Sequence, residues 1–189
     1  MTENTPLIVD GWLQWAEFCP SPNFNLRPDN IDISLLIIHN ISLPPGEFGG
    51  GYVQQFFQNK LDASAHPYFE TIAELKVSAH LFIERDGKVT QFVPFNARAW
   101  HAGSSSFAGA SDCNNYSIGI ELEGADEIPF SDAQYRALEK VTRQLLLTYP
   151  KLTPERITGH SDVAPGRKTD PGPAFDWQRY RNALVQSSG

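Results

Sequence analysis

The stretch Ser34–Asn40 reads SLLIIHN and contains four consecutive apolar residues, Leu35 to Ile38. A short continuous apolar run is typical of a β-strand that is buried on both faces, as strands in parallel sheets are. The run ends on His39. Folds that combine strands and helices commonly place site residues just beyond the end of such a strand. His39 is therefore a candidate site residue, although a single histidine can also be satisfied by one backbone carbonyl in a core.

Two further segments predict strands. Residues 80–93, HLFIERDGKVTQFV, have two apolar-rich arms on either side of Asp86-Gly87, a dipeptide favoured in tight turns. They predict an antiparallel hairpin. Apolar and polar residues alternate strictly along residues 117–124, SIGIELEG, which predicts a strand with one apolar face.

Three segments predict helices. Ser131 and Gln134 form a capping-box pattern, after which apolar residues recur at helical spacing over residues 135–149. Shorter helices are expected at residues 176–185 and 52–57. Because strands and helices are interspersed and the hairpin requires an antiparallel pair, the sequence predicts an α/β fold with a central mixed sheet flanked by helices.

Length and composition favour one domain. The chain has 189 residues, of which 41% are hydrophobic, enough for one well-buried core and short for two. We expect a single domain over residues 1–189, with its core at approximately residues 25–186. Cys19 and Cys113 have no metal-binding spacing and are expected to be free structural thiols.

Charge and hydropathy restrict the partners. The net charge is −7, and Lys and Arg form no cluster in the sequence, whereas nucleic-acid surfaces usually need a basic patch. An uncharged or cationic partner fits better. No apolar run approaches the roughly 20 residues of a membrane span, and the first residues, MTENTPLIVDGW, do not resemble a signal peptide. We therefore expect a soluble, cytoplasmic protein that binds neither nucleic acid nor membrane.

The segment 157–175, ITGHSDVAPGRKTDPGPAF, is interrupted by three prolines and so predicts a loop. Loops of this kind on rigid scaffolds often carry functional residues. A stiffened loop can hold His160, Lys168 and Asp170 at fixed positions. It can also be an ordinary proline-rich surface loop, and this segment alone does not separate the two interpretations.

His39, His160 and Asp170 form a candidate zinc site. Two imidazoles and one carboxylate are a common catalytic zinc set, which leaves the fourth tetrahedral position for water. Asp170 precedes Pro171, which restricts its backbone and favours it as the third ligand. The competing ligands, which spacing does not exclude, are Asp162, His66, His80 and His101.

Lys168 and Glu121 are candidate helpers in catalysis. In an extended segment residues two apart project to the same side, so Lys168 can face a substrate bound near Asp170 and stabilise a developing oxyanion; most lysines, however, are simply solvated. Glu121 lies on the face of its strand opposite the apolar residues, beside Gly119, where a carboxylate can transfer a proton. Glu123 lies on the same face, and alternation alone does not choose between the two.

Taken together, these segments closely resemble the zinc-dependent N-acetylmuramoyl-L-alanine amidases. Within that family the likeness is greatest to the cytoplasmic branch of 1,6-anhydro-N-acetylmuramyl-L-alanine amidases. The likeness covers nearly the whole chain and rests on long motifs. These are GWL, PSPNFNLRPD, LLIIHNISLPPGEFGG, AHPYF, VSAHLFIERDGKVTQFVPF, RAWHAG, CNNYSIGIELEG, SDAQY and TGHSDVAPGRKTDPGPAFDW.

The resemblance implies a role for each candidate. It makes His39, His160 and Asp170 the ligands of one Zn²⁺ in a surface groove, Glu121 the acid/base residue and Lys168 the oxyanion-stabilising residue. It implies a monomer that cleaves small anhydromuramyl-peptides in peptidoglycan recycling and so affects β-lactamase induction. The alternatives are an exported amidase that acts on intact wall and a recognition module that binds peptidoglycan without cutting it.

Three more residues are candidate substrate contacts. Trp100 and His101 can supply an apolar wall and a hydrogen-bond donor for a sugar-peptide ligand, although Trp100 can equally be a core residue. Asn40, next to His39, can bond a peptide backbone or cap the strand end. Asp112 stands where this branch of the family tends to be basic, which puts in doubt any contact that this segment makes with substrate carboxylates.

Overall fold

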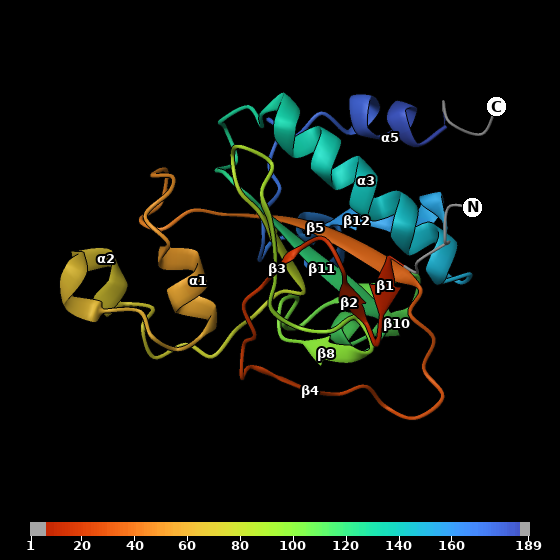
Figure 1. The fold of residues 1–189 in the computed structure, drawn as a ribbon, viewed down its shortest axis with the longest axis horizontal. Helices are drawn as coiled ribbons and strands as arrows, with labels where there is room; N and C mark the ends of the chain where they lie inside the picture. Colours follow the sequence, from red (N-terminus) through yellow and green to blue (C-terminus); the bar gives the residue numbers. More distant parts are fainter. Residues whose placement is uncertain (1–6, 186–189) are drawn as a thin grey trace.

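The computed structural model describes residues 7–185. Its centre is a six-stranded mixed sheet in the order β12-β5-β11-β6-β7-β3 (Figure 1). The four strands from β12 to β6 run parallel to their neighbours, and β6 and β7 form an antiparallel hairpin. The strands of this sheet are β3 (Glu17–Phe18), β5 (Leu35–Ile41), β6 (Leu81–Ile83), β7 (Val89–Gln91), β11 (Ser117–Glu123) and β12 (Ile157–Gly159).

Helices and short ribbons surround the sheet. The α-helices are α1 (Tyr52–Phe57), α2 (Pro67–Glu70), α3 (Asp132–Thr148), α4 (His160–Val163) and α5 (Trp177–Val185). The 3₁₀ turns are η1 (Ala63–Ala65), η2 (Cys113–Asn115) and η3 (Pro154–Arg156). Three antiparallel ribbons pair β1 (Ile8–Val9) with β2 (Trp12–Leu13), β4 (Phe24–Leu26) with β8 (Ala97–Ala99), and β9 (Ser106–Phe107) with β10 (Ala110–Ser111).

One face of the sheet is covered by α3 and α5 (Figure 1). The alternating apolar residues of β11, Ile118, Ile120 and Leu122, belong to this core together with Leu138 of α3. Burying one such side chain stabilises the fold by about 1.5–3 kcal/mol. The capping box between Ser131 and Gln134 starts α3 as the sequence predicts.

The opposite face of the sheet is covered only in part by helices. α1 and α2 pack Phe56, Phe57 and Phe69 against Phe82 of β6. Leu35 and Ile37 of β5 pack instead against η2 and the end of α4. The carboxyl ends of β5 and β11 lie between these two clusters, and this is where the polar residues of those strands gather.

The predicted mixed α/β fold in a single domain is confirmed, with three local differences. The segment 157–175, predicted as a loop, begins with β12 and the short helix α4. β5 continues two residues beyond His39, because β11 pairs with it as far as Ile41. The hairpin turns through a longer loop, in which the N–H of Glu84 donates to the carbonyl oxygen of Lys88 and Gly87 has a positive φ. The ends of the predicted domain, residues 1–6 and 186–189, lie outside the described residues.

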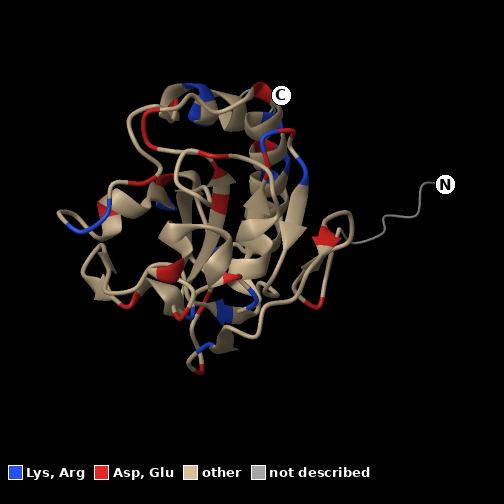
Figure 2. Cartoon of the chain, turned by 90° about the vertical axis from the view of Figure 1, so that its left-hand side faces the viewer, with Lys and Arg blue, Asp and Glu red and all other residues tan. Residues whose placement is uncertain are grey.

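The side of the molecule that carries α1 presents charges of both signs. Figure 2 shows acidic and basic residues interspersed on this side.

Among the helices of residues 7–185, none combines the length and the apolar character that a membrane crossing requires.

Candidate active site

Three parallel strands bring His39, Glu121 and His160 together. β5 and β11 pair with His39 directly opposite Glu121. β12 pairs with the other edge of β5 up to Gly159, which lies opposite Ile38, so His160 follows beside His39. Since facing residues of parallel strands form rows across a sheet, the ends of these strands present two imidazoles and one carboxylate side by side.

The loop after α4 returns Asp170 to the same place. The N–H of Ser161 donates to the carbonyl oxygen of Asp170 at 2.9 Å. Gly159 leaves room for this return, because a Cβ there would lie 2.8 Å from Cδ of Pro171. Nδ2 of Asn40 donates to the carbonyl oxygen of Pro171 at 3.0 Å. These contacts fix the carboxylate of Asp170 next to the two histidines.

Nδ1 of His39, Nδ1 of His160 and Oδ2 of Asp170 form a nearly equilateral triangle. Its sides are 3.0 Å between the two nitrogens, 2.9 Å from His39 to Asp170 and 3.1 Å from His160 to Asp170. Within residues 7–185 this is the group of His, Cys, Asp and Glu side chains that could hold a metal ion. A tetrahedral zinc ion with bonds of about 2.0–2.1 Å keeps its ligand atoms about 3.3 Å apart, so the triangle needs to widen by only a few tenths of an ångström.

The ring nitrogens that face away from the triangle also have partners. Nε2 of His160 lies 3.0 Å from the carbonyl oxygen of Ala102. With a metal ion in the triangle, Nε2 of His160 would carry the proton and donate it to this carbonyl oxygen, and Nδ1 would offer its lone pair to the ion. Nε2 of His39 lies 2.9 Å from Nδ1 of His101. Metal-ligating histidines almost always bond through their second nitrogen, so the donor set fits zinc.

Burial and the contacts within the triangle set the charge of these groups. Burial lowers the pKa of His39, although the bond with Asp170 opposes the shift, so the imidazole is neutral near pH 7. Burial alone would raise the pKa of Asp170, but the hydrogen bonds with His160 and His39 outweigh it and hold that pKa well below its usual range. A neutral imidazole and an ionised carboxylate are the forms that bind metal.

Glu121 extends from β11 toward the triangle. Its Oε1 lies 4.0 Å from Nδ1 of His39, and its side chain is 12% exposed. Its buried Oε2 has no hydrogen-bond partner within residues 7–185. Burial, together with the charge of Asp170, raises the pKa of Glu121 well above its usual range, and Lys168 opposes the shift. An unpartnered buried carboxylate oxygen is costly for stability, so its position beside the triangle indicates a functional role.

Glu123, the alternative that alternation left open, lies on the same strand, but its hydrogen-bond partners lie outside the triangle. It is buried, and its carboxylate accepts from the N–H groups of Gly49 and Arg85. Glu123 therefore holds the glycine-rich loop before α1 and the β6–β7 hairpin. The structure places Glu121, and not Glu123, next to the triangle.

Asp162 and His66, two competing metal ligands, have other partners. Oδ2 of Asp162 accepts from Oγ1 of Thr158 and from the N–H of Gly159, at the start of α4. Nδ1 of His66 accepts from the N–H of Tyr68 and caps α2. Both side chains therefore stabilise the ends of short helices.

His80, the third competitor, is fully buried. Its Nδ1 accepts from the N–H of Gly119, and its Nε2 donates to the carbonyl oxygen of Ala97. Burial, with the charge of Arg27, lowers the pKa of His80 to about 3, so the ring is neutral. His80 ties β11 to β8 and leaves neither nitrogen for a metal.

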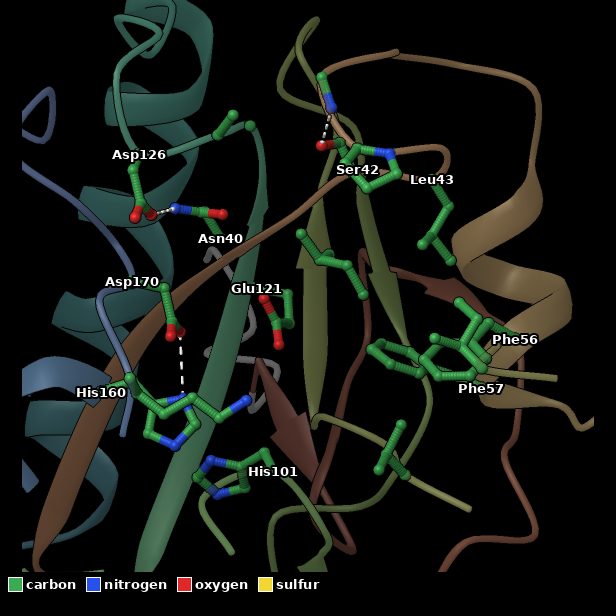
Figure 3. A pocket seen from close by; sticks show the side chains of 18 of the residues that line it. Asn40, Ser42, Leu43, Phe56, Phe57, His101, Glu121, Asp126, His160 and Asp170 are labelled. Carbon is green, nitrogen blue, oxygen red and sulfur yellow. Dashed lines mark hydrogen bonds and ion pairs between the residues drawn. The ribbon is translucent and has the colours of Figure 1, made fainter. Parts of the chain in front are cut away.

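A groove of about 740 Å³ opens over Glu121, His160 and Asp170. Figure 3 shows these polar side chains on one side of it and the apolar side chains of Leu43 and Phe56 on the other. Lys168 is exposed and lines the groove. The groove thus combines a charged floor with an apolar wall, as sites for small ligands commonly do.

Trp100 and Asn40 also line the groove. Trp100 is half-buried, and its Nε1 donates to Oδ1 of Asn25 at 2.7 Å. Asn40 lies inside β5, and its Nδ2 donates to Oδ1 of Asp126 at 2.7 Å (Figure 3). Asp126 lines the groove as well, and only its closeness in the sequence to β11 could have indicated it.

Ser117 and Asn114, which the sequence did not indicate, form hydrogen bonds with residues that contact the two histidines of the triangle. Oγ of Ser117 lies 3.1 Å from Nε2 of His101. Oδ1 of Asn114 accepts from the N–H groups of His101 and Ala102. Their partners are distant in the sequence, so no local pattern could reveal them. Asp112, in the same region, is exposed and has a left-handed backbone at the start of η2.

Comparisons with known proteins agree with this geometry. The chain is 57% identical over 177 residues to the 1,6-anhydro-N-acetylmuramyl-L-alanine amidase AmpD of Haemophilus influenzae, which covers 94% of this chain and 96% of that protein. Its fold matches a crystal structure of a selenomethionine derivative of AmpD with a TM-score of 0.92 and 53% identity, over 95% of this chain and 99% of the other.

A structure with bound substrate is also similar. It is the complex of the amidase AmiD of Escherichia coli with anhydro-N-acetylmuramic acid-L-Ala-D-γ-Glu-L-Lys, with a TM-score of 0.60 and 28% identity, over 83% of this chain and 60% of that one. The sequence pattern of the N-acetylmuramoyl-L-alanine amidases matches residues 29–173, which contain every candidate site residue. The chain therefore belongs to the N-acetylmuramoyl-L-alanine amidase family.

Proposed function

We propose that the chain hydrolyses the amide bond between the lactyl group of 1,6-anhydro-N-acetylmuramic acid and the L-alanine of its stem peptide. The observation that carries the proposal is the unpartnered Oε2 of Glu121 beside the triangle of His39, His160 and Asp170. Amide hydrolysis needs an activated water, a proton carrier and a group that stabilises an oxyanion. The groove offers residues for all three.

His39, His160 and Asp170 would hold one zinc ion. Bound there, zinc acts as a Lewis acid and lowers the pKa of water to about 7. The outer bonds of the two imidazoles support this assignment, because they engage both Nε2 atoms and so turn both Nδ1 atoms toward the ion's position.

Glu121 is the proposed proton carrier. It takes a proton from the attacking water and delivers it to the alanine nitrogen as the amide bond breaks. Burial raises its pKa above its usual range, and a pKa nearer to neutral suits a group that must both accept and donate a proton. Lys168, on the groove wall, stabilises the negative charge that develops on the carbonyl oxygen.

The proposed substrate is a small soluble anhydromuramyl-peptide. Support comes from relatives named for the 1,6-anhydro sugar and from the AmiD complex with a peptide of that sugar. Trp100, His101 and Asn40 line the groove and are proposed to contact this ligand. In this role the protein is a cytoplasmic monomer that recycles wall fragments, and the level of those fragments affects β-lactamase induction.

The experiment compares three substrates at equal amide concentration: an anhydromuramyl-tripeptide, the matching non-anhydro muramyl-tripeptide and intact wall sacculi. Release of stem peptide should be far faster from the first, because an enzyme acting on free fragments draws binding energy from groups that flank the scissile bond. Equal or faster cleavage of sacculi would favour an exported amidase. Binding without cleavage of any of them would favour a recognition module.

A further inference from the structure

His101 lies directly behind a proposed zinc ligand. Its Nδ1 is 2.9 Å from Nε2 of His39, on the side of that ring opposite the triangle. The two rings meet edge to face, with an interplanar angle of 89°. On the far side of His101, Nε2 lies 3.1 Å from Oγ of Ser117. Both ring nitrogens of His101 are thus engaged by the protein itself.

Two further features hold His101 in place, one at its backbone and one at its ring. Its backbone N–H donates to Oδ1 of Asn114. A Cβ on Gly119 would lie only 2.4 Å from Nδ1 of His101, so the ring occupies the space that a side chain would fill. Glycine in the interior of a strand costs about 0.5–1 kcal/mol relative to alanine. The space above Gly119 is therefore used to seat the His101 ring.

We propose that His101 is a positioning residue that fixes the tautomer of His39. For Nδ1 of His39 to offer its lone pair to a metal, the proton must sit on Nε2 and be donated to Nδ1 of His101. His101 then carries its own proton on Nε2 and donates it to Oγ of Ser117. His101 also lines the groove, so this role adds to the substrate contact predicted for His101 from the sequence.

The same short segment serves both histidine ligands. The carbonyl oxygen of Ala102, the next residue, accepts from Nε2 of His160. Oδ1 of Asn114 binds the N–H groups of both His101 and Ala102 and so holds their spacing. His39 is therefore oriented by a side chain and His160 by a backbone carbonyl. A substitution can remove the side-chain partner of His39, but it cannot remove the backbone carbonyl group of Ala102.

The inference rests on the proposed zinc site, and the test measures zinc binding as well as hydrolysis. His101→Ala should weaken zinc affinity about 10- to 100-fold, as loss of an outer partner of a ligand typically does. His101→Asn should restore most of it, because its amide oxygen is attached to Cγ, as Nδ1 is. In His101→Gln the amide oxygen lies one bond further from the backbone, so this variant should not restore zinc affinity. His66→Ala, at the cap of α2, is the matched control and should bind zinc normally.

A second readout is the proton position itself. Two-bond ¹H–¹⁵N correlations on the zinc-loaded protein should show His101 with its proton on Nε2. A proton on Nδ1 of His101 would overturn the inference, and so would wild-type zinc affinity in His101→Ala or equal rescue by Asn and Gln. Failure of the wild-type chain to bind zinc at all would instead contradict the proposed metal site.

Discussion

His39 and Glu121 face one another across adjacent parallel strands, with Oε1 of Glu121 4.0 Å from Nδ1 of His39. The register of β5 and β11 therefore sets the distance between a proposed zinc ligand and the proposed proton carrier. Both residues lie within strands of a buried sheet and not on mobile loops, which is the arrangement that a site of fixed geometry needs. The third residue of the site, His160, directly follows β12, which pairs with the other edge of β5.

Glu121→Gln should leave zinc bound while turnover falls on the order of a hundredfold or more, because the amide cannot carry the proton. The substitution changes the shape of the side chain little, and the buried Oε2 has no partner within residues 7–185 to lose. Steady-state turnover and zinc content, measured on the same samples, check this. Unchanged turnover would remove Glu121 from the mechanism.

His160→Ala should lose most of its zinc, whereas Asp162→Ala should keep it. Asp162 caps α4 through the N–H of Gly159, so its loss should lower the free energy of unfolding by about 1 kcal/mol. Zinc content after dialysis against metal-free buffer, together with urea unfolding, distinguishes the two effects. The opposite pattern of zinc loss would mean that Asp162 is the ligand.

Lys168→Met should lower turnover by about 10²–10³-fold, the typical cost of removing one stabilising donor at an oxyanion. Zinc content should not change, because Lys168 is not part of the triangle. Lys168→Arg, which keeps the charge, should recover part of the activity. Equal turnover in Lys168→Met and the wild type would show that the lysine is a solvated surface residue.

The stability of the zinc-free protein should depend on pH through His80. The folded pKa of His80, about 3, lies below the unfolded value of about 6.5, so the unfolded chain binds the extra proton. The contribution of neutral His80 is complete above pH about 6.5 and is lost as pH falls toward 3. Urea unfolding between these pH values should show a steeper loss for the wild type than for His80→Gln. Parallel curves for the two proteins would contradict the assignment.

The strands and helices could be predicted from the sequence because their signals are local. The apolar run before His39, the alternation in 117–123 and the Ser131 capping box each depend on residues within one element. The fold and these elements are as predicted. The two histidines and Asp170 were selected by chemistry and by the family resemblance, and the structure brings their ligand atoms together.

The choice between Glu121 and Glu123 could not be made from alternation. The pattern places both residues on the same face of the strand, but it does not show which side chains lie next to each of them. That choice depends on strand register and on the loop that donates to Glu123. The bond between His101 and His39 joins residues 62 positions apart, so no local pattern reveals it. The extension of β5 beyond His39 likewise results from its pairing with β11.

Peptide release from an anhydromuramyl-tripeptide before and after removal of zinc tests the proposed zinc mechanism most directly. The purified chain should carry one zinc ion per molecule. Release of the tripeptide should stop when a chelator removes the ion and return when zinc is added, because His39, His160 and Asp170 form an open three-ligand site. Full turnover by the metal-free protein would contradict that mechanism.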